Sequence, residues 1–402
     1  MRTVVFVAPF LMEATLKFVR AAASLPGFRI VVVTQDGPEK IPQGCHHWRV
    51  PDATNVEPIV EAARGVARQW GGIHRLVGIL ENIQEQLAAA REILGVPGTT
   101  RVVAERCRDK SLMKTVLREA GLPCAKHRLL HSHDEGMAAA KEIGFPLVIK
   151  PPDGAGCRST YQVSSFEELN HVLTELRPAP GREALAEEFI TGDEFSFDTI
   201  TIHGKVLFRN ILRYLPGPLD VTRNDWIQWC VVAPRNIDTP EFAPIHAVGP
   251  KVNEVLGIHT AFTHMEWFRR PDGSPVVSEI GARPPGAQFT TLMSYAHGRN
   301  FYRAWAQAIL EERLEGPIER THAAGCAYLR GPGQGRVARV LNVDKAQERV
   351  GHLVVEAKLP QVGKPKNAHY EGDGYVIVRH PDTRVVEQAL KIIVETIRTE
   401  YT

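Results

Sequence analysis

The sequence predicts an α/β protein that begins with a doubly wound parallel sheet. Short runs of apolar, mostly β-branched residues indicate buried strands, and amphipathic helical patterns follow them. These strands and helices are expected, in chain order, at 3–8, 11–24, 29–34, 55–70, 76–81 and 83–94. Strands that alternate with helices form βαβ units, so we expect a parallel sheet over residues 1–100. No GxGxxG pattern follows the first strand, which argues against a dinucleotide site.

The length of the chain predicts several domains. At 402 residues and 44% hydrophobic composition, the chain can bury a large core. Pro178 and Pro180 mark a linker, and the C-terminal part combines short strands and Gly/Pro turns with a final helix near 383–399. We expect four segments, of which the last is a small α+β domain: 1–100, 101–183, 184–318 and 319–402.

Composition excludes several classes of protein. The 48 basic and 46 acidic residues give a net charge of +2, which argues against nucleic acid as the main partner. The cysteines show no CxxC or zinc-finger spacing, so we expect reduced thiols and no zinc site. The apolar start favours a strand and helix over a secretion signal, and no run approaches the length of a membrane span. We therefore expect a soluble, cytoplasmic protein with no membrane partner.

A glycine-rich loop follows an apolar strand in "LVIKPPDGAGCRST", residues 147–160. After a basic helix (101–121) and a second helix (134–143), this strand leads into the loop, then "TYQV" and a helix at 165–176. The loop lacks the GKS/T ending of a Walker sequence, and a strand follows it. Its glycines let backbone amides approach phosphate oxygens, although an ordinary glycine turn remains the alternative. The candidate phosphate-contacting residues are Gly154, Ala155, Gly156, Cys157, Arg158 and Ser159.

Two lysines are further candidates for binding phosphate. Lys150 closes the buried strand, where an ammonium group is costly unless it meets an anion or water. Lys110 lies at the start of a helix, where a basic residue opposes the macrodipole. A solvated helix charge is the alternative for Lys110.

The acidic segment "LAEEFITGDEFSFDTI" (185–200) is a connection between two lobes followed by a half-buried strand. A connection with exposed backbone polar groups could bind an adenine edge, and Glu194 is well placed for ribose hydroxyls. An acidic linker is the alternative. The candidate residues for the adenine are Glu187, Glu188, Phe189 and Ile190.

A β-hairpin is predicted over "THMEWFRRPDGSPVVSEIGARPPGA" (263–287), with "PDG" as its turn. Alternation places His264 and Glu266 on one face of the first strand and Val277 and Glu279 on one face of the second. Glu266 and Glu279 can then meet across the pair. Adjacent carboxylates repel unless a cation binds them or one is protonated, and oxygen ligands favour Mg²⁺, with Mn²⁺ as an alternative.

The hairpin also offers other charged groups. A structural ion pair with Arg269 or Arg270 is the alternative to a metal for the two glutamates. Arg283, just beyond Glu279, could hold a carboxylate or phosphate through two parallel hydrogen bonds.

In order and spacing, these motifs resemble the ATP-grasp superfamily of carboxylate–amine ligases. The resemblance rests on "RDK", "LVIKP…GAG", "EEFITGDEFS", "MEW" and "SEIGARPPG", and the last segment looks like the C-terminal domain of L-amino-acid ligases. It implies a two-lobed ATP-grasp fold after the first domain. It also implies that Lys110 and Lys150 hold the α- and β-phosphates of ATP and that the loop 153–159 closes over the phosphates.

The remaining roles are implied in the same way. Glu187, with the backbone of Glu188 and Ile190, would face adenine, and Glu194 would face the ribose. Glu266 and Glu279 would coordinate Mg²⁺, and Arg283 would bind the carboxylate substrate and its phosphorylated form. The superfamily commonly has Asn two residues after the second Glu, but Gly281 stands here, which leaves a second metal position open.

The function expected from the resemblance is an ATP-dependent ligase that forms an amide through an acyl phosphate, as in dipeptide synthesis, with amino acids as the carboxylate and the amine. The alternatives are a nucleotide-pathway ligase that uses formate or bicarbonate, and a non-catalytic ATP-binding module. His264 is a candidate general base, and Glu81, Arg223 and Trp226 are candidate substrate contacts, although buried packing is the simpler expectation for Trp226 and Trp229. Relatives often form homodimers, and the sequence leaves this open.

Overall fold

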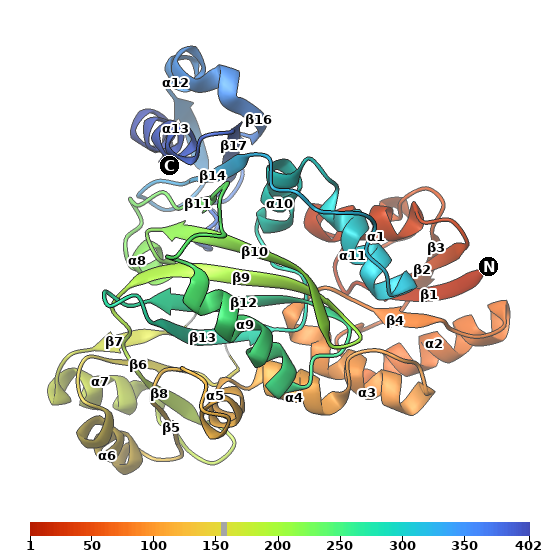
Figure 1. The fold of residues 1–402 in the computed structure, drawn as a ribbon, viewed down its shortest axis with the longest axis horizontal. Coiled ribbons are helices and arrows are strands. Elements are labelled where there is room, and N and C mark those ends of the chain that lie inside the picture. The colour runs from red at the N-terminus through yellow and green to blue at the C-terminus, as the bar shows by residue number, and fades with distance from the viewer. Residues whose placement is uncertain (154–158) are drawn as a thin grey trace.

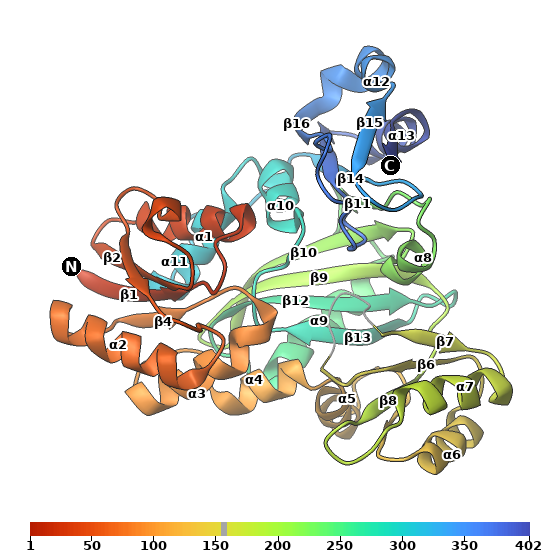
Figure 2. The same cartoon turned by 180° about the vertical axis from the view of Figure 1, so that it is seen from behind.

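The protein was analysed as a computed structural model, which describes residues 1–153 and 159–402. An N-terminal sheet, a small sheet and a large central sheet follow one another, and the C-terminal residues extend the large sheet (Figure 1). The N-terminal and C-terminal parts lie at different ends of the central sheet, as the reverse view also shows (Figure 2). The predicted loop contacts of Gly154, Ala155, Gly156, Cys157 and Arg158 fall outside the described residues.

The N-terminal sheet is parallel, as predicted, with strand order β3-β2-β1-β4. Its strands are β1 (Arg2–Val7), β2 (Phe28–Thr34), β3 (His46–Arg49) and β4 (Arg75–Val77), and its helices are α1 (Glu13–Ala23), α2 (Val56–Trp70) and α3 (Gln84–Leu94). The edge strand β3 was not predicted, because its sequence HHWR lacks the apolar run of a buried strand. The strand expected to run to residue 81 ends at Val77 instead, and Glu81 begins a short 3₁₀ turn.

The basic stretch predicted as one helix forms two, α4 (Arg101–Arg108) and α5 (Lys110–Glu119). Asp109 breaks it, because its backbone is extended and its side chain accepts hydrogen bonds from the amides of Ser111 and Leu112. Lys110 is therefore the first residue of α5, which agrees with its predicted place at a helix start.

The small sheet is antiparallel, with strand order β5-β8-β6-β7. It contains β5 (His127–Leu130), β6 (Leu147–Lys150), β7 (Tyr161–Val163) and β8 (Ala184–Glu188), and α6 (His133–Ile143) and α7 (Phe166–Leu176) pack on it. The predicted arrangement of a strand on each side of the glycine loop is confirmed, since β6 pairs with β7.

The large sheet has the order β13-β12-β9-β10-β11-β14-β17-β16. Its strands are β9 (Asp193–Ile202), β10 (Lys205–Leu215), β11 (Cys230–Ala233), β12 (Ala261–Arg269), β13 (Pro275–Gly281), β14 (Ala323–Leu329), β16 (Val354–Lys358) and β17 (Gly374–His380). The helices that accompany it are α8 (Pro218–Arg223), α9 (Ala243–Leu256), α10 (Phe289–His297), α11 (Phe301–Glu311), α12 (Val343–Val350) and α13 (Thr383–Thr396). A separate pair, β15 (Val337–Leu341) and β18 (Arg398–Tyr401), lies beside the C-terminal helices.

Strand pairing crosses two of the predicted segment boundaries. Strand β8 follows residue 183 but pairs with β5 and β6, and β14 continues the large sheet through β11. The four-domain division remains a proposal, in which β8 belongs with the small sheet.

The predicted hairpin of β12 and β13 forms, but the face predicted for the side chain of Val277 was wrong. Glu266 lies directly opposite Glu279, whereas Trp267 lies opposite Val277, so the register skips Ser278 in a β-bulge. The extra residue reverses the alternation, and Val277 packs in a buried cluster with Met265 and Trp267 while Glu279 lies on the face of Glu266. Val277 and Glu279 therefore do not share a face.

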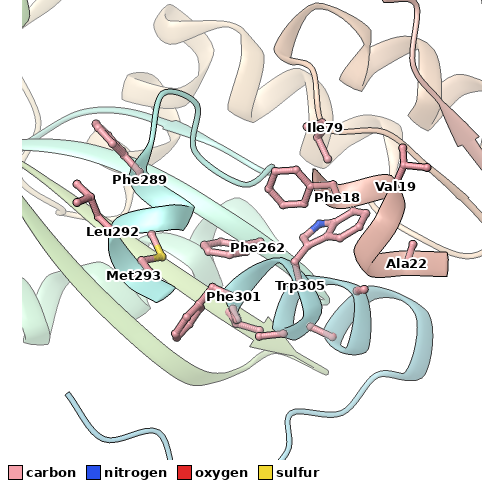
Figure 3. Close-up of a cluster of buried hydrophobic side chains, with 14 of the residues drawn as sticks. Phe18, Val19, Ala22, Ile79, Phe262, Phe289, Leu292, Met293, Phe301 and Trp305 are labelled. Carbon is pink, nitrogen blue, oxygen red and sulfur yellow. The ribbon is translucent and has the colours of Figure 1, made fainter. Parts of the chain in front are cut away.

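A large aromatic cluster joins the N-terminal sheet to the large sheet (Figure 3). Phe18 of α1 meets Trp305 of α11 edge to face, with ring centroids 5.1 Å apart, and Phe6 of β1 lies 5.9 Å from the same tryptophan. Phe262 of β12 and Phe301 of α11 are buried in the same cluster. This core fixes the N-terminal sheet in position, so that the loop after β4 reaches the β13 end of the large sheet.

Within the described ranges, no helix combines the length and apolarity that crossing a bilayer requires. The described cysteines are free thiols, in agreement with the prediction for them.

Candidate active site

Two adjoining cavities contain most of the predicted site residues. The inter-sheet cavity, of about 130 Å³, lies between the small sheet and strands β9, β12 and β13. The Arg283 cavity, of about 200 Å³, lies beyond it, next to Arg283 and Glu81. The two share the lining residues Lys110, Glu266, Glu279 and Tyr370. A molecule in one cavity therefore lies next to a molecule in the other.

The inter-sheet cavity brings together residues that are far apart in the sequence. Its walls include the described residues predicted to contact phosphate, adenine, ribose and metal, with the exception of Ser159: Lys110, Lys150, Glu187, Glu188, Phe189, Ile190, Glu194, Glu266 and Glu279. Ser159 has a positive φ of 50° and does not line the cavity. The geometry gathers these side chains, while their individual roles remain predictions.

A buried ion-pair network forms one wall of this cavity. Glu187 is 4% exposed and lies between Lys114, at 2.9 Å, and Lys150, at 2.8 Å. Burial raises the pKa of Glu187, but the two lysine charges outweigh it and lower the pKa to about 2. The carboxylate is thus engaged by lysines, and its predicted adenine contact stays a prediction.

Lys114 was missed by the sequence reasoning. Its side chain is fully buried, and its ammonium also donates to the carbonyl of Ser278. Because Lys114 follows Lys110 by four residues, the two lie on the same helix face, and this spacing could have identified it.

Carboxylates converge at the junction of the two cavities. Glu279 lies 2.9 Å from the ammonium of Lys110, and the hydroxyl of Tyr214 donates to Glu266 at 3.3 Å. Burial raises the pKa of Glu279, but Lys110 and Lys150 outweigh it and lower the pKa. Burial and the charges of Glu266 and Glu279 raise the pKa of Glu194 well above its usual value.

This donor set fits a divalent cation bound with phosphate oxygens. The carboxylates supply the hard oxygen ligands that Mg²⁺ takes, and the pKa of Glu194 is raised first by burial and then by neighbouring carboxylate charge, which a cation would compensate. No cluster of three or more His, Cys, Asp or Glu side chains arranged to hold a metal occurs in the parts of the chain that the structure describes. The alternative ion pairs are not formed, because Arg269 pairs with Asp193 and Glu241, and Arg270 with Glu188.

His264 is held by a buried aspartate. Its Nδ1 lies 2.6 Å from Asp198, and its Nε2 lies 3.6 Å from Glu266. Burial lowers the pKa of His264, but the hydrogen bonds to Asp198 and Glu266 outweigh it and raise the pKa to about 9. A ring that is already protonated near neutral pH cannot accept a proton, which weakens its candidacy as a general base. The role of Asp198 was missed by the sequence reasoning.

Arg283 is paired with Glu81, which the sequence singled out separately. The Nε of Arg283 donates to Glu81, and its Nη1 donates to the carbonyl of Pro284 at 2.9 Å. A Cβ added at Gly281 would lie 3.1 Å from Glu81 Oε2. The glycine at position 281 thus leaves room for a carboxylate from the 3₁₀ turn that follows β4.

The other two predicted substrate residues lie elsewhere. Arg223 donates to the side chain of Gln162 at 2.5 Å, and Trp226 is 69% exposed; neither lines either cavity. The prediction of buried packing was wrong for Trp226 and correct for Trp229, which lines the Arg283 cavity. Trp229 stacks on Tyr328 with ring centroids 5.0 Å apart and meets Tyr370 edge to face at 4.8 Å. The C-terminal contribution of Tyr370 and Glu371 was missed, because their turn carries no recognisable motif.

Comparison with known proteins shows a family match over part of the chain. Residues 143–291 match the ATP-grasp domain. An L-arginine-specific L-amino acid ligase from Bacillus subtilis is 27% identical over 208 residues, covering 50% of this chain and 49% of that protein. The match thus spans about half the length of this curated relative.

Two crystal structures have a similar fold. An L-amino acid ligase from Bacillus licheniformis matches with a TM-score of 0.82 and 20% identity, covering 100% of this chain and 99% of that one. A carboxyaminoimidazole ribonucleotide synthase from Aspergillus clavatus, complexed with ATP, matches with a TM-score of 0.70 and 18% identity, covering 98% of each chain. The predicted fold class is confirmed, and so is the predicted resemblance, since residues 143–291 match the ATP-grasp domain.

Proposed function

We propose that the protein is an ATP-dependent carboxylate–amine ligase that forms an amide, as in a dipeptide, and releases ADP and phosphate. The observation that carries the proposal is the contact between the two cavities. One is lined by lysines and carboxylates suited to Mg²⁺ and a nucleotide, and the other contains an arginine suited to a carboxylate. The shared wall of Lys110, Glu266 and Glu279 is where phosphoryl transfer would occur.

The inter-sheet cavity would bind ATP. Lys110 and Lys150 are placed to contact phosphate oxygens, and Glu194 to contact the ribose. Glu266 and Glu279 would hold Mg²⁺, or Mn²⁺, which neutralises phosphate charge when bound. The lysines and glutamates are held by ion pairs before substrate arrives, so little reorganisation is needed.

The Arg283 cavity would bind the carboxylate. A carboxylate resists attack by an amine because its negative charge makes it a poor electrophile, and phosphorylation supplies a leaving group. Arg283 would orient the carboxylate and its phosphorylated form, while Glu81 holds the guanidinium in place. The protonated His264 faces the same space and can donate a hydrogen bond to developing negative charge.

Amino acids are the substrate class that we favour. An amino acid carries an ammonium group beside its carboxylate, and the Arg283 cavity offers carboxylate side chains next to Arg283. A nucleotide-pathway amine carries a phosphate, which the charges of Glu81 and Glu371 would repel. The similarity to amino acid ligases supports the same choice, and free thiols suit a reducing cytoplasm.

The test is an ADP-release screen in which each common amino acid serves in turn as carboxylate and as amine, with mass spectrometry of the products. The expected result is ADP release that depends on both partners and a product mass of the two amino acids less one water. ADP release only with bicarbonate or formate and a phosphorylated amine would favour the nucleotide-pathway reaction. ATP binding without ADP release from any pair would favour a non-catalytic module.

A further inference from the structure

Glu371 lines the Arg283 cavity but takes no part in the chemistry described above. Four carboxylates line this cavity, and three of them have partners: Glu81 pairs with Arg283, Glu266 with Tyr214, and Glu279 with Lys110. Glu371 makes no hydrogen bond or ion pair with any residue that the structure describes. Burial raises the pKa of its carboxyl group above the usual value. The side chain is partly buried, so a carboxylate there without a partner loses part of its hydration, and a bound ligand would compensate that loss.

The turn that presents Glu371 is braced from several sides. The amide of Asn367 donates to one carboxylate oxygen of Asp373 at 2.8 Å, and the hydroxyl of Tyr401 donates to the other at 2.5 Å. Gly372 has a positive φ of 64°, and a Cβ there would lie 2.4 Å from the carbonyl oxygen of Leu329. Only glycine fits this position, so the neighbouring side chain is held in a defined place.

Aromatic side chains form the wall beside Glu371. Trp229, Phe289 and Tyr370 line the same cavity. Aromatic faces combined with a carboxylate attract organic ammonium groups through cation–π and ion-pair interactions. Tyr370 also lines the inter-sheet cavity, so this wall continues to the place where the acyl phosphate would form.

We propose that Glu371 binds the ammonium group of the amine substrate and accepts one of its protons as the nitrogen attacks the acyl phosphate. The proposal rests on the ligase function above. Glu371 takes one proton from the ammonium, a carbon–nitrogen bond forms, and the carbon–oxygen bond to phosphate breaks. The phosphate leaves with the electron pair and takes the second proton, so the products are the amide, hydrogen phosphate and a protonated Glu371.

The other ionisable groups around the cavity are poorly suited to this step. Both ring nitrogens of His264 face carboxylates, since Nδ1 lies 2.6 Å from Asp198 and Nε2 lies 3.6 Å from Glu266. Burial raises the pKa of Cys326 and of Tyr328 of β14, and the charge of Glu371 raises both further. The other charged and titratable groups that line the cavity are Glu81, Cys107, Arg108, Lys110, His264, Glu266, Glu279, Arg283 and Tyr370.

The experiment separates the two halves of the reaction. Hydroxylamine is largely uncharged at neutral pH and captures an acyl phosphate without a protein base, whereas an amino acid amine arrives as an ammonium ion. Wild type, E371Q, E371D and the control E387Q, which changes a glutamate on α13 that lines neither cavity, are each assayed for ATP- and carboxylate-dependent hydroxamate and for amide. The carboxylate and amine are those selected by the ADP-release screen.

We expect E371Q to keep hydroxamate formation within about twofold and to lose about 10²–10⁴-fold in amide formation, the usual contribution of a general base. E371D should recover part of the amide activity, and E387Q should match wild type. The melting temperature of E371Q should be equal to or above that of wild type, because the substitution removes a partly buried charge that has no partner among the described residues.

Three results would overturn the proposal. They are undiminished amide formation by E371Q, an equal loss of hydroxamate and amide, and a raised Mg²⁺ requirement for hydroxamate formation, which would assign Glu371 to the cation. Absence of hydroxamate from the wild type with every carboxylate would instead refute the ligase function itself.

Discussion

At the scale of single residues, the site is built from charges that are buried and paired. Glu187 forms ion pairs with two lysines. Lys110 forms an ion pair with Glu279, and Arg283 forms one with Glu81. A buried ion pair is a weak source of net stability, but removing one partner leaves an uncompensated charge. These pairs hold the side chains in place before substrates bind, and single substitutions should therefore be costly.

Lys114→Met should lower the free energy of unfolding by about 3–5 kcal/mol, because Glu187 loses one of its two partners in a buried site. The double variant K114M/E187Q should be closer to wild type than the sum of the two single changes. Urea denaturation of the four proteins measures this coupling. Strict additivity would show that the two side chains do not interact.

Glu187 should also contribute to the acid sensitivity of the fold. Its folded pKa of about 2 lies below the ordinary value of 4.5, so its stabilisation is complete above pH 4.5 and is lost as the pH falls toward 2. This difference between the folded and the ordinary pKa corresponds to about 3 kcal/mol in the free energy of unfolding. The stability gap between wild type and Glu187→Gln, followed by denaturation at several pH values, should shrink across this window. A gap that is constant with pH would contradict the assignment.

Glu81→Gln should raise the KM for the carboxylate substrate while leaving the KM for ATP nearly unchanged. Glu81 orients Arg283 in the Arg283 cavity but does not line the inter-sheet cavity. Steady-state kinetics with each substrate varied in turn provide the measurement. Glu61→Gln, at an exposed position on α2 in the same N-terminal part of the chain, is the control. Equal changes in both KM values would indicate a general distortion of the site.

At the scale of elements, the hairpin of β12 and β13 sets the geometry of the predicted cation site. Its turn could be predicted from "PDG", and its register places Glu266 opposite Glu279. The bulge at Ser278 could not be predicted, because bulges have no strong sequence signature and depend on tertiary contacts such as the bond from Lys114 to Ser278. The break between α4 and α5 was missed for a similar reason, since Asp109 can stand within a helix as well as cap one.

Glu266→Gln should raise the Mg²⁺ concentration for half-maximal ADP release by at least about tenfold, since even outer contacts of metal ligands are worth about 10–100-fold in metal affinity. Titration of Mg²⁺ at fixed ATP measures the effect, and Mn²⁺ should give a parallel change. Glu254→Gln, an exposed position on α9, is the control. An unchanged Mg²⁺ requirement would remove Glu266 from the cation site.

At the scale of the whole molecule, the two cavities depend on parts of the chain that are far apart. Glu81 comes from the N-terminal sheet, Arg283 follows β13, and Tyr370 and Glu371 precede β17. The order of the motifs predicted the ATP-grasp domain and the members of the inter-sheet cavity. It could not predict that the C-terminal turn reaches the Arg283 cavity, because that placement follows from the pairing of β11 with β14 across the large sheet.

Trp305→Ala should lower the free energy of unfolding by about 3–5 kcal/mol, the usual cost of emptying a large aromatic site. Trp305 is 3% exposed and packs between Phe18 and Phe6, so its loss should also loosen the N-terminal sheet that carries Glu81. Hydrogen exchange should then increase in β1 and β4 before it increases in the small sheet. An equal increase of hydrogen exchange in the N-terminal sheet and the small sheet would contradict this prediction.

The extension of the large sheet into the C-terminal residues has a consequence for the kinetic order of binding. The walls of the Arg283 cavity come from the large sheet and its neighbours, and none of them belongs to the small sheet. The inter-sheet cavity, in contrast, needs β6 and β8 for its second wall. If the small sheet moved on binding ATP, most walls of the Arg283 cavity would keep their shape, with Lys110, which hydrogen-bonds to the carbonyl of Pro152, as the exception. We expect the carboxylate and amine substrates to bind free enzyme in random order with ATP, so that initial-velocity plots intersect and dead-end amino acid analogues do not require nucleotide.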